Sequence, residues 1–280
     1  MDAVEKLSRQ DFKDLRDYIY DQSGLHFSDA KLYFLENRIS RRLKEFSMKT
    51  YQEYLAYIKR PINRGEQFKL YDAITTNETS FYRNPPQIDA FARDILPKVV
   101  KSIREKGQTR LRIWSAACST GEEPYTLAMI LHDKKELLRG LDVTVFATDI
   151  SNEVLDLAKE GLYLPYTMRN LSQKFQQRYF KKEEKSFRIT DEIKSMVKIS
   201  YLNLVDYNGF RRFRNMDIIL CRNVLIYFDL PVKREIIKGF WECLNKDSYM
   251  LIGHSESLHN INRDFKMKHY ARALAYLKEK

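Results

Sequence analysis

The feature that most constrains the fold of this chain is an alternation, from about residue 86 onward, of short apolar runs with amphipathic helical stretches. Strands that alternate with helices predict an α/β domain, because each helix can carry the chain back to begin another parallel strand. The predicted strands cover residues 111–114, 143–147, 217–221, 249–252 and 271–277. The predicted helices between and before them cover residues 87–105, 124–138, 152–161 and 231–244.

The first 75 residues have helical periodicity throughout. Ser8 and Asp11 form a capping pattern before the first apolar stripe, and Gly24 is a stop signal. Two more helices follow, one capped by Ser28, and breaks occur at residues 60–65 and 84–86. We therefore expect a helical domain over residues 1–75, a linker over 76–85 and the α/β domain over 86–280.

The stretch from 162 to 204 is too long for a plain connection between a strand and a helix. It contains a helical segment (171–180) and then two alternating apolar segments (187–189 and 197–201) around Asp191 and Glu192. These segments predict a small antiparallel β-subdomain inserted at about residues 181–202.

Several classes of protein are disfavoured by composition. The longest apolar runs are far shorter than the roughly 20 residues of a membrane span, and the first residues lack the apolar core of a signal peptide. Three cysteines without a CxxC pair argue against a disulfide framework, so we expect a cytoplasmic protein. The net charge of +11 favours an acidic partner, which could be nucleic acid, an anionic membrane surface or a protein.

In an open parallel sheet, ligands bind at the carboxyl ends of the strands, so the residues that follow each strand are the candidate site. Asp149 stands at the end of the second predicted strand, where it could accept hydrogen bonds from both ribose hydroxyls of an adenosine ligand. Asp is also common at the start of a helix, and by itself the residue leaves these two interpretations level.

The loop after the first strand contains a single glycine, Gly121, followed by Glu122 and Glu123. A pyrophosphate requires a glycine-rich turn and a helix N-terminus free of negative charge, so this loop argues against NAD, FAD or ATP. S-adenosylmethionine fits better, since one acid could hold its ribose and another its amino group. Taken alone, the two glutamates are more simply explained by favourable interaction with the helix dipole.

Residues 76–83 place polar side chains and two aromatics between the domains, which suggests the lining of a cleft; helix capping and packing of Phe81 and Tyr82 is the alternative. The five histidines have no ligand spacing, and no metal site is expected. There is no nucleophile elbow, Walker loop or HExxH motif, so hydrolytic chemistry has no visible machinery.

Five separated segments together resemble the CheR family, the glutamate O-methyltransferases that act on chemotaxis receptors. They are 76–83 (TNETSFYR), 114–125 (WSAACSTGEEPY), 146–150 (FATDI), 221–228 (CRNVLIYF) and 253–256 (GHSE). The resemblance covers nearly the whole chain. It implies a class I S-adenosylmethionine-dependent methyltransferase fold of the Rossmann-like α/β class, with a mostly parallel seven-stranded sheet, an all-helical N-terminal domain and an inserted antiparallel β-subdomain.

The resemblance also implies the function and the site. The expected reaction transfers a methyl group from S-adenosylmethionine to receptor glutamates during chemotactic adaptation, leaving glutamyl methyl esters and S-adenosylhomocysteine. The family's cofactor contacts fall on Asn77, Thr79, Arg83, Glu123, Asp149, Asn203, Leu204, Arg222 and Asn223. Tyr227 matches the tyrosine placed near the transferred methyl group, and linker residues 76–85 would line the cofactor cleft.

The substrate needs little chemical activation. A glutamate side chain with a pKa near ~4.3 is already ionised at neutral pH, so the attack requires no general base. Arg83 and Tyr227 are the candidates for orienting that carboxylate. Because strong pairing with Arg83 would stabilise the ground state, we favour a role for Arg83 on the cofactor side.

Positive charge on the second predicted helix suggests a docking surface. Arg38, Arg41 and Arg42, with Lys31 and Lys44 nearby, could bind the acidic methylation helices of receptors, although an ordinary solvated helix face is the better explanation of these charges taken alone. By resemblance, we expect the enzyme to be recruited to receptor arrays at the membrane without inserting into it.

One departure from the family concerns residues 181–187 (KKEEKSF), which have no glycine and look shortened where some members carry a glycine-rich hairpin that binds a receptor's C-terminal peptide. We therefore expect no peptide tether.

Two alternative functions are kept. The first is a nucleic-acid methyltransferase. It is disfavoured because residues 222–225 (RNVL) stand where amine-methylating enzymes have Asp/Asn-Pro-Pro-Tyr/Phe, so no nucleic acid is expected as a partner. The second is a non-catalytic S-adenosylmethionine sensor.

Overall fold

The structure is a computed structural model that describes residues 5–279, and its first part is a group of four α-helices. Ser8 caps the first helix by accepting a hydrogen bond from the Asp11 N–H, and Gly24, in the left-handed conformation, ends it as expected. The helices and short 3-10 turns of this domain are α1 (Arg9–Ser23), η1 (Asp29–Lys31), α2 (Leu32–Glu45), α3 (Tyr51–Ile58), η2 (Pro61–Asn63) and α4 (Arg64–Ile74). Helix α4 follows the break that the sequence indicated at residues 60–65, and this helix was not itself predicted.

The second part is built on a seven-stranded sheet with the order β6-β2-β1-β7-β8-β10-β9. The first five strands of this order are parallel, and β10 and β9 run antiparallel at one edge, which confirms a mostly parallel seven-stranded sheet. The strands are β1 (Arg110–Ala116), β2 (Asp142–Asp149), β6 (Val197–Tyr201), β7 (Met216–Cys221), β8 (Leu244–Ile252), β9 (Lys266–Tyr270) and β10 (Ala273–Lys278). Strand order reverses between β1 and β7, where an open sheet of this kind binds its ligand.

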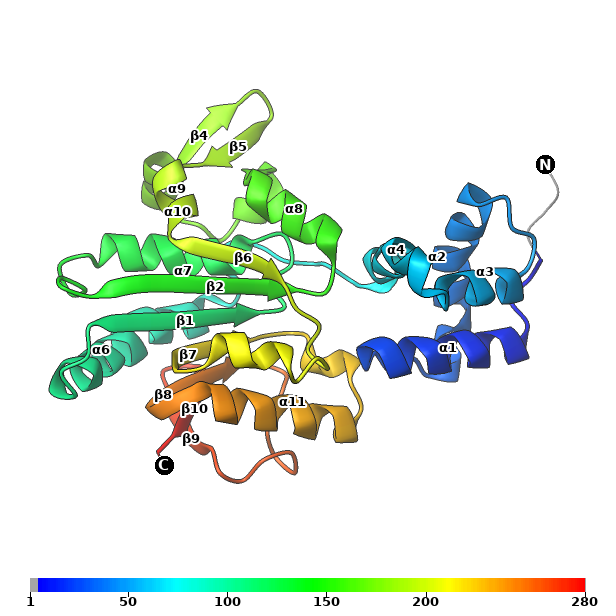
Figure 1. Ribbon diagram of the computed structural model, residues 1–280. Coiled ribbons are helices and arrows are strands. Elements are labelled where there is room, and N and C mark those ends of the chain that lie inside the picture. The colour runs from blue at the N-terminus through cyan, green and yellow to red at the C-terminus, as the bar shows by residue number, and fades with distance from the viewer. Residues whose placement is uncertain (1–4, 280) are drawn as a thin grey trace.

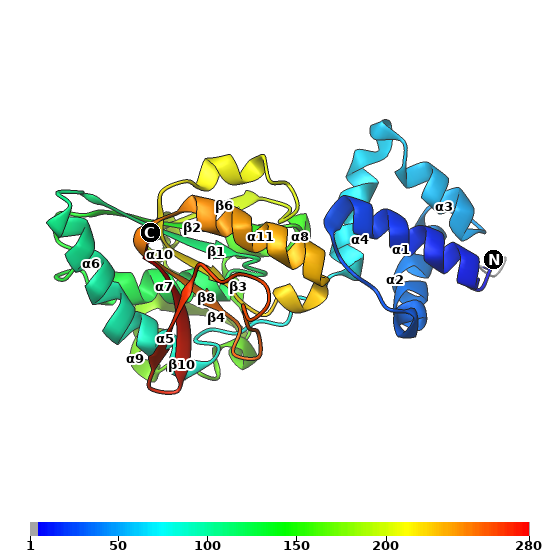
Figure 2. The ribbon, with the colours of Figure 1, turned by 90° about the horizontal axis from the view of Figure 1, so that it is seen from below.

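Helices cover both faces of this sheet (Figures 1 and 2). Because side chains alternate along a strand, β1 sends Trp114 into one apolar cluster with α11 and Ile113 into another with α6 and α7. The helical elements of this part are α5 (Pro85–Ala90), the π-helix η3 (Phe91–Ile95), α6 (Leu96–Glu105), α7 (Glu122–Asp133), α8 (Asn152–Glu160), η5 (Gly209–Phe213), η6 (Leu225–Tyr227) and α11 (Leu230–Cys243). Helix α7 ends earlier than the predicted residue 138.

The inserted subdomain carries a three-stranded antiparallel sheet with the order β3-β5-β4. Its elements are β3 (Leu162–Tyr163), η4 (Pro165–Met168), α9 (Gln173–Tyr179), β4 (Phe180–Glu183), β5 (Ser186–Ile189) and α10 (Asp191–Ser195). The predicted bounds of 181–202 were wrong at both ends. The small sheet already includes β3 at Leu162–Tyr163, and residues 197–201 form β6, which pairs in parallel with β2 in the main sheet. Alternation of apolar residues identifies a strand but does not show which sheet it joins.

The helical domain lies beyond the carboxyl ends of the parallel strands (Figure 1). Besides the linker that follows α4, the turn after α1 contacts the second part, where Leu25 forms a β-bridge with Phe228 and the His26 N–H donates to the Tyr227 carbonyl over 2.9 Å. The hydroxyl of Tyr20 also donates to Asp229. The domain is therefore attached directly to the segment that follows β7.

Candidate active site

A cavity of about 340 Å³ lies where the strands β1, β2 and β7 end and the helical domain covers them. All the residues that the sequence assigned to the cofactor, and Tyr227, line it: Asn77, Thr79, Arg83, Glu123, Asp149, Asn203, Leu204, Arg222, Asn223 and Tyr227. The helical domain contributes a further wall that was not predicted, formed by Ser23, Leu25, His26, Phe27, Lys31 and Phe34. The roles of these residues toward a ligand stay predictions.

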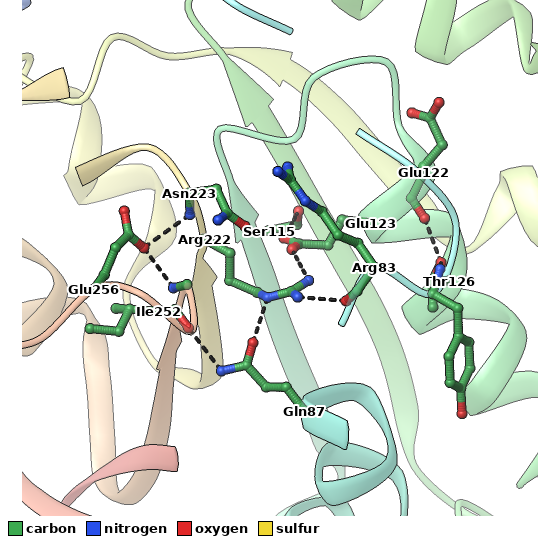
Figure 3. Close-up of polar contacts among 12 residues, drawn as sticks. Arg83, Gln87, Ser115, Glu122, Glu123, Thr126, Arg222, Asn223, Ile252 and Glu256 are labelled. Carbon is green, nitrogen blue, oxygen red and sulfur yellow. Dashed lines mark hydrogen bonds and ion pairs between the residues drawn. The ribbon is translucent and has the colours of Figure 1, made fainter. Parts of the chain in front are cut away.

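Arg222 is the centre of the polar network under this cavity (Figure 3). Its buried guanidinium pairs with the Glu123 carboxylate over 2.9 Å. Its other two nitrogens donate to the side-chain oxygen of Gln87 over 2.7 Å and to the Arg83 carbonyl over 2.6 Å. Every nitrogen of Arg222 therefore has a protein partner, and the side chain acts as a fixed positive charge that holds Glu123 in place.

Gln87 was not singled out from the sequence. It is buried at the start of α5, and its amide donates to the carbonyl of Ile252, so it links the helix to the end of β8. The neighbouring Pro85 and Pro86 explain where the helix starts but give no indication of this contact. Only the tertiary structure brings Gln87 to Arg222.

The two adjacent glutamates have different environments. Glu123 accepts hydrogen bonds from Ser115 and Arg222 and lines the cavity. The side chain of Glu122 points away from this cluster, is bonded by the Thr120 hydroxyl over 2.6 Å, and does not line the cavity (Figure 3). Burial raises the pKa of Glu122. Of the two glutamates, only Glu123 is therefore placed to accept a hydrogen bond from a cationic ligand group.

Asp149, at the end of β2, is buried and accepts two backbone hydrogen bonds. One carboxylate oxygen accepts from the Ser119 N–H over 2.9 Å and the other from the Ser151 N–H over 3.0 Å. Burial is the largest influence on its pKa and raises it, whereas these N–H groups lower it. Each oxygen keeps a second lone pair, so anchoring the loop is compatible with contacting a ligand.

The loop after β1 explains why one glycine is sufficient there. Ala117 and Ser119 adopt positive φ values of 62° and 50°, and Gly121 adopts 95°. A Cβ atom at Gly121 would lie 2.9 Å from the Tyr163 hydroxyl, which makes glycine necessary at this position. The Cys118 N–H donates to the Thr148 carbonyl, so the loop folds back over the end of β2.

Segment 76–83 combines the two interpretations that the sequence left open. Thr76, Asn77, Glu78, Thr79 and Arg83 line the cavity, and an Arg83 nitrogen donates to the Glu78 carbonyl over 2.7 Å. Phe81 is instead fully buried against Tyr163, in an edge-to-face contact. The aromatic residue therefore anchors a segment whose polar side chains face the site.

Comparison with known proteins gives a family for this geometry. Residues 77–274 match the family described as CheR methyltransferase, SAM binding domain, and residues 10–75 match CheR methyltransferase, all-alpha domain. The chain belongs to the CheR methyltransferase family. This confirms the resemblance seen in the sequence, the class of fold and a methyltransferase that uses S-adenosylmethionine.

Curated relatives of this CheR methyltransferase match over most of their length. A chemotaxis protein methyltransferase of Borreliella burgdorferi is 36% identical over 90% of this chain and 89% of the relative. One of Salmonella typhimurium is 34% identical over 94% and 88%, and one of Escherichia coli is 33% identical over 96% and 92%. The likeness therefore includes both the helical domain and the methyltransferase domain.

The three arginines expected to dock a receptor do not share one environment in this CheR methyltransferase. Arg41 is exposed, and the Arg38 guanidinium lies over the Phe34 ring at the cavity wall, 5.4 Å from its centre. Arg42 pairs with Glu66 over 2.6 Å, and the side chains are only 14% and 5% exposed. The docking hypothesis is therefore corrected for Arg42, whose guanidinium is held by Glu66. Helical periodicity places Arg42 on the same face of α2 as Arg38 but does not reveal its partner on α4.

Within residues 5–279, no three His, Cys, Asp or Glu side chains come together as a metal site. None of the helices in the same range is both long and apolar enough to cross a membrane.

Proposed function

We propose that this CheR methyltransferase transfers the methyl group of S-adenosylmethionine to glutamate side chains of bacterial chemoreceptors, giving glutamyl methyl esters during adaptation. The names of its relatives, chemotaxis protein methyltransferases, support the pathway. The observation that carries the proposal is a cavity at the strand ends whose lining includes the carboxylates of Asp149 and Glu123, and Glu123 is paired with Arg222.

The cavity fits the cofactor through its hydrogen-bond acceptors. Asp149 can accept from the ribose hydroxyls with its remaining lone pairs, and Glu123 can accept from the amino group. The other proposed contacts come from the linker and from the segments after β6 and β7: Asn77, Thr79, Arg83, Asn203, Leu204, Arg222 and Asn223. Arg222 lines the cavity and also holds Glu123 in place through its Nη1.

S-adenosylmethionine supplies the electrophilic methyl group when it is bound. The protein's task is then to bring an ionised glutamate into line with that group and to exclude water, so proximity and desolvation provide most of the rate enhancement. The helical domain lines the cavity with Phe27 and Phe34, whose rings stack 5.9 Å apart. The absence of a paired base and nucleophile in the sequence agrees with a substrate that needs no deprotonation.

Tyr227 is proposed to contact the reacting carboxylate, and Arg83 is proposed to lie beside it. Tyr227 lines the cavity from η6, and its carbonyl is fixed by the His26 N–H. Its phenol can orient the incoming carboxylate by donating a hydrogen bond. Arg83 is tied to the Glu78 carbonyl, which favours a role on the cofactor side over direct pairing with the substrate.

The acidic methylation helices of the receptors are the proposed partners of α2. Lys31 lines the cavity, and Arg38 and Arg41 extend the positive charge along the helix. A chain with Arg38→Glu and Arg41→Glu should show a raised Michaelis constant for receptor and an unchanged turnover number. Lys101→Glu with Lys135→Glu is the matched control, since both lysines are exposed and the charge change is equal. Equal Michaelis constants for the two double variants would refute this docking surface.

Recruitment to membrane receptor arrays would then occur through α2, and we propose no tether through the inserted subdomain. The β4–β5 hairpin pairs Glu183 with Ser186, so only Glu184 and Lys185 form its turn. Titration with receptor tail peptides should show no binding at micromolar concentrations. Saturable binding there would overturn this part of the proposal.

The test of the function is transfer from methyl-labelled S-adenosylmethionine to a receptor cytoplasmic fragment, with duplex DNA and RNA as parallel acceptors. We expect label on the receptor alone, released by alkali as a glutamyl ester would be. Alkali-stable label on nucleic acid would refute the substrate assignment. Cofactor binding without any transfer would indicate a sensor in place of an enzyme.

A further inference from the structure

The carboxylate of Glu256 accepts three backbone hydrogen bonds from two different segments. One oxygen accepts from the Gly253 N–H over 2.6 Å and from the Asn223 N–H over 2.9 Å. The other accepts from the Ile226 N–H over 3.3 Å. Figure 3 shows this carboxylate beside Asn223, on the far side of Arg222 from Glu123. Glu256 thus joins the end of β8 to the loop that follows β7.

That loop has a backbone conformation that needs support. Asn223 has a φ of 61°, in the left-handed region that costs energy for residues other than glycine. The chain then turns through η6 to present Tyr227 to the cavity. A loop of this kind keeps one conformation only if its surroundings hold it.

Gly253 makes room for the carboxylate. A Cβ atom at this position would lie 2.6 Å from the Glu256 oxygen and 2.9 Å from the Asn223 nitrogen. Both distances are shorter than any normal contact of a Cβ atom, so only glycine allows Glu256 to approach the loop. This close approach explains the glycine and the glutamate of the sequence GHSE at 253–256.

The loop is held at both ends by other contacts. Arg222, just before it, is fixed by Gln87 and Glu123, and the Tyr227 carbonyl at its end accepts the His26 N–H. Glu256 supplies the contacts in between, at Asn223 and Ile226. An ionised carboxylate suits this task, since it has only acceptors to offer to three N–H donors.

We propose that Glu256 is a positioning residue for methyl transfer, whose carboxylate holds the loop from Asn223 to Tyr227 in the conformation that presents the tyrosine to the substrate. The inference rests on the proposed role of Tyr227. Glutamine at 256 would replace one acceptor oxygen with an NH2 donor that faces a backbone N–H. The loop would lose at least one of its hydrogen bonds while the side-chain volume stays the same.

The experiment is a double-mutant cycle in the full-length chain, with turnover on a receptor fragment measured at saturating cofactor. Glu256→Gln should lower the turnover number by about tenfold or more, which corresponds to about 1.4 kcal/mol of activation free energy. In a Tyr227→Phe background the same substitution should lower it by no more than about twofold, because the two residues act through one group. Glu235→Gln, an exposed glutamate on α11, is the control and should change neither value.

Thermal unfolding of each variant separates loss of fold from loss of positioning. If Glu256→Gln does not fold, Gly253→Ala provides a second test, because the added methyl group displaces the carboxylate from the loop. Additive effects in the cycle, or unchanged turnover in a folded variant, would overturn the role of Glu256 alone. A wild-type chain that transfers no methyl group to receptor would overturn the proposed function, and this inference with it.

Discussion

Arg222 donates to Glu123 over 2.9 Å, although the two residues are separated by 99 positions in the sequence. They meet because β1 and β7 are neighbours in the sheet, with Ser115 paired to Leu220, so the segments that follow the two strands start side by side. The pair is almost completely buried, with side chains only 3% and 12% exposed. The acid that faces the cavity is therefore held in one orientation, which lowers the cost of ordering it upon binding.

The first prediction concerns this acid. Glu123→Gln should weaken the binding of S-adenosylmethionine by about 10- to 150-fold, as expected for a charge-assisted hydrogen bond worth roughly 1.5 to 3 kcal/mol. Isothermal titration calorimetry would measure the change. Glu122→Gln is the matched control and should leave the affinity unchanged, because Glu122 does not line the cavity. Equal losses in the two variants would contradict the assignment.

The second prediction concerns Asp149. Asp149→Ala should lower cofactor affinity by about 10- to 150-fold and also reduce stability, since the Ser119 and Ser151 N–H groups lose their acceptor. Asp149→Asn keeps one acceptor oxygen and should lose affinity with a smaller loss of stability. Calorimetry and urea unfolding on the same samples would separate the two effects. An unchanged affinity in both folded variants would leave Asp149 as a structural anchor only.

The third prediction concerns Tyr227. Tyr227→Phe should lower the turnover number on a receptor fragment and leave cofactor affinity intact, because the phenol is proposed to act on the substrate carboxylate. Steady-state kinetics with cofactor and receptor varied separately would show this. If the turnover number equals that of the wild-type chain, the tyrosine contributes packing alone.

How far the sequence could predict this structure depends on whether a signal is local. Ser8 was correctly predicted to start a helix, because a capping residue acts on N–H groups two or three positions away. Strand β9 was not predicted, and β6 was assigned to the wrong sheet, because edge strands carry weak or ambiguous apolar patterns.

The residues of the site also differ in whether a local signal could identify them. Glu123 and Asp149 could be placed in the site from their positions after predicted strands, whereas the other cofactor contacts were implied by the resemblance to the CheR family and the wall from the helical domain was not predicted. The role of Gln87 and the burial of Arg42 could not be predicted, because each depends on a partner from another part of the chain. Gln87 contacts Arg222, and Arg42 pairs with Glu66. A helical face indicates direction but not the residue that it meets.

The fourth prediction follows from that burial. Arg42→Ala should lower the free energy of unfolding by about 3 kcal/mol, since it leaves the buried Glu66 carboxylate without its cation and with the Tyr54 hydroxyl as remaining donor. Arg41→Ala, at an exposed position on the same helix, should change it by less than about 0.5 kcal/mol. Urea unfolding of both variants provides the comparison. A small effect at Arg42 would mean that the pair is not important for stability.

The fifth prediction uses the pKa of Glu122, which burial raises above its ordinary value near ~4.3. Between these two pKa values the folded chain binds more protons than the unfolded chain, so this residue makes the protein less stable as the pH rises. Glu122→Gln removes that contribution. The stability of the variant relative to wild type should therefore increase from about pH 4 upward and level off above the raised pKa.

Urea unfolding across this pH range would measure the difference in stability, with the exposed Glu136→Gln as the control. A difference that stays constant with pH would show that Glu122 has the same proton affinity in the folded and unfolded chains.

The β-bridge between Leu25 and Phe228 belongs to an apolar cluster that runs without interruption from Leu35 in α2 to Trp114 in the middle of the sheet. Two regions that share one core lose their packing together, so we expect the helical domain and the methyltransferase domain to melt in a single cooperative transition. A fragment that begins after residue 75 would expose the apolar surface around Phe228 and would tend to associate with itself. The cofactor-binding domain of this chain is thus a poor candidate for isolation by truncation.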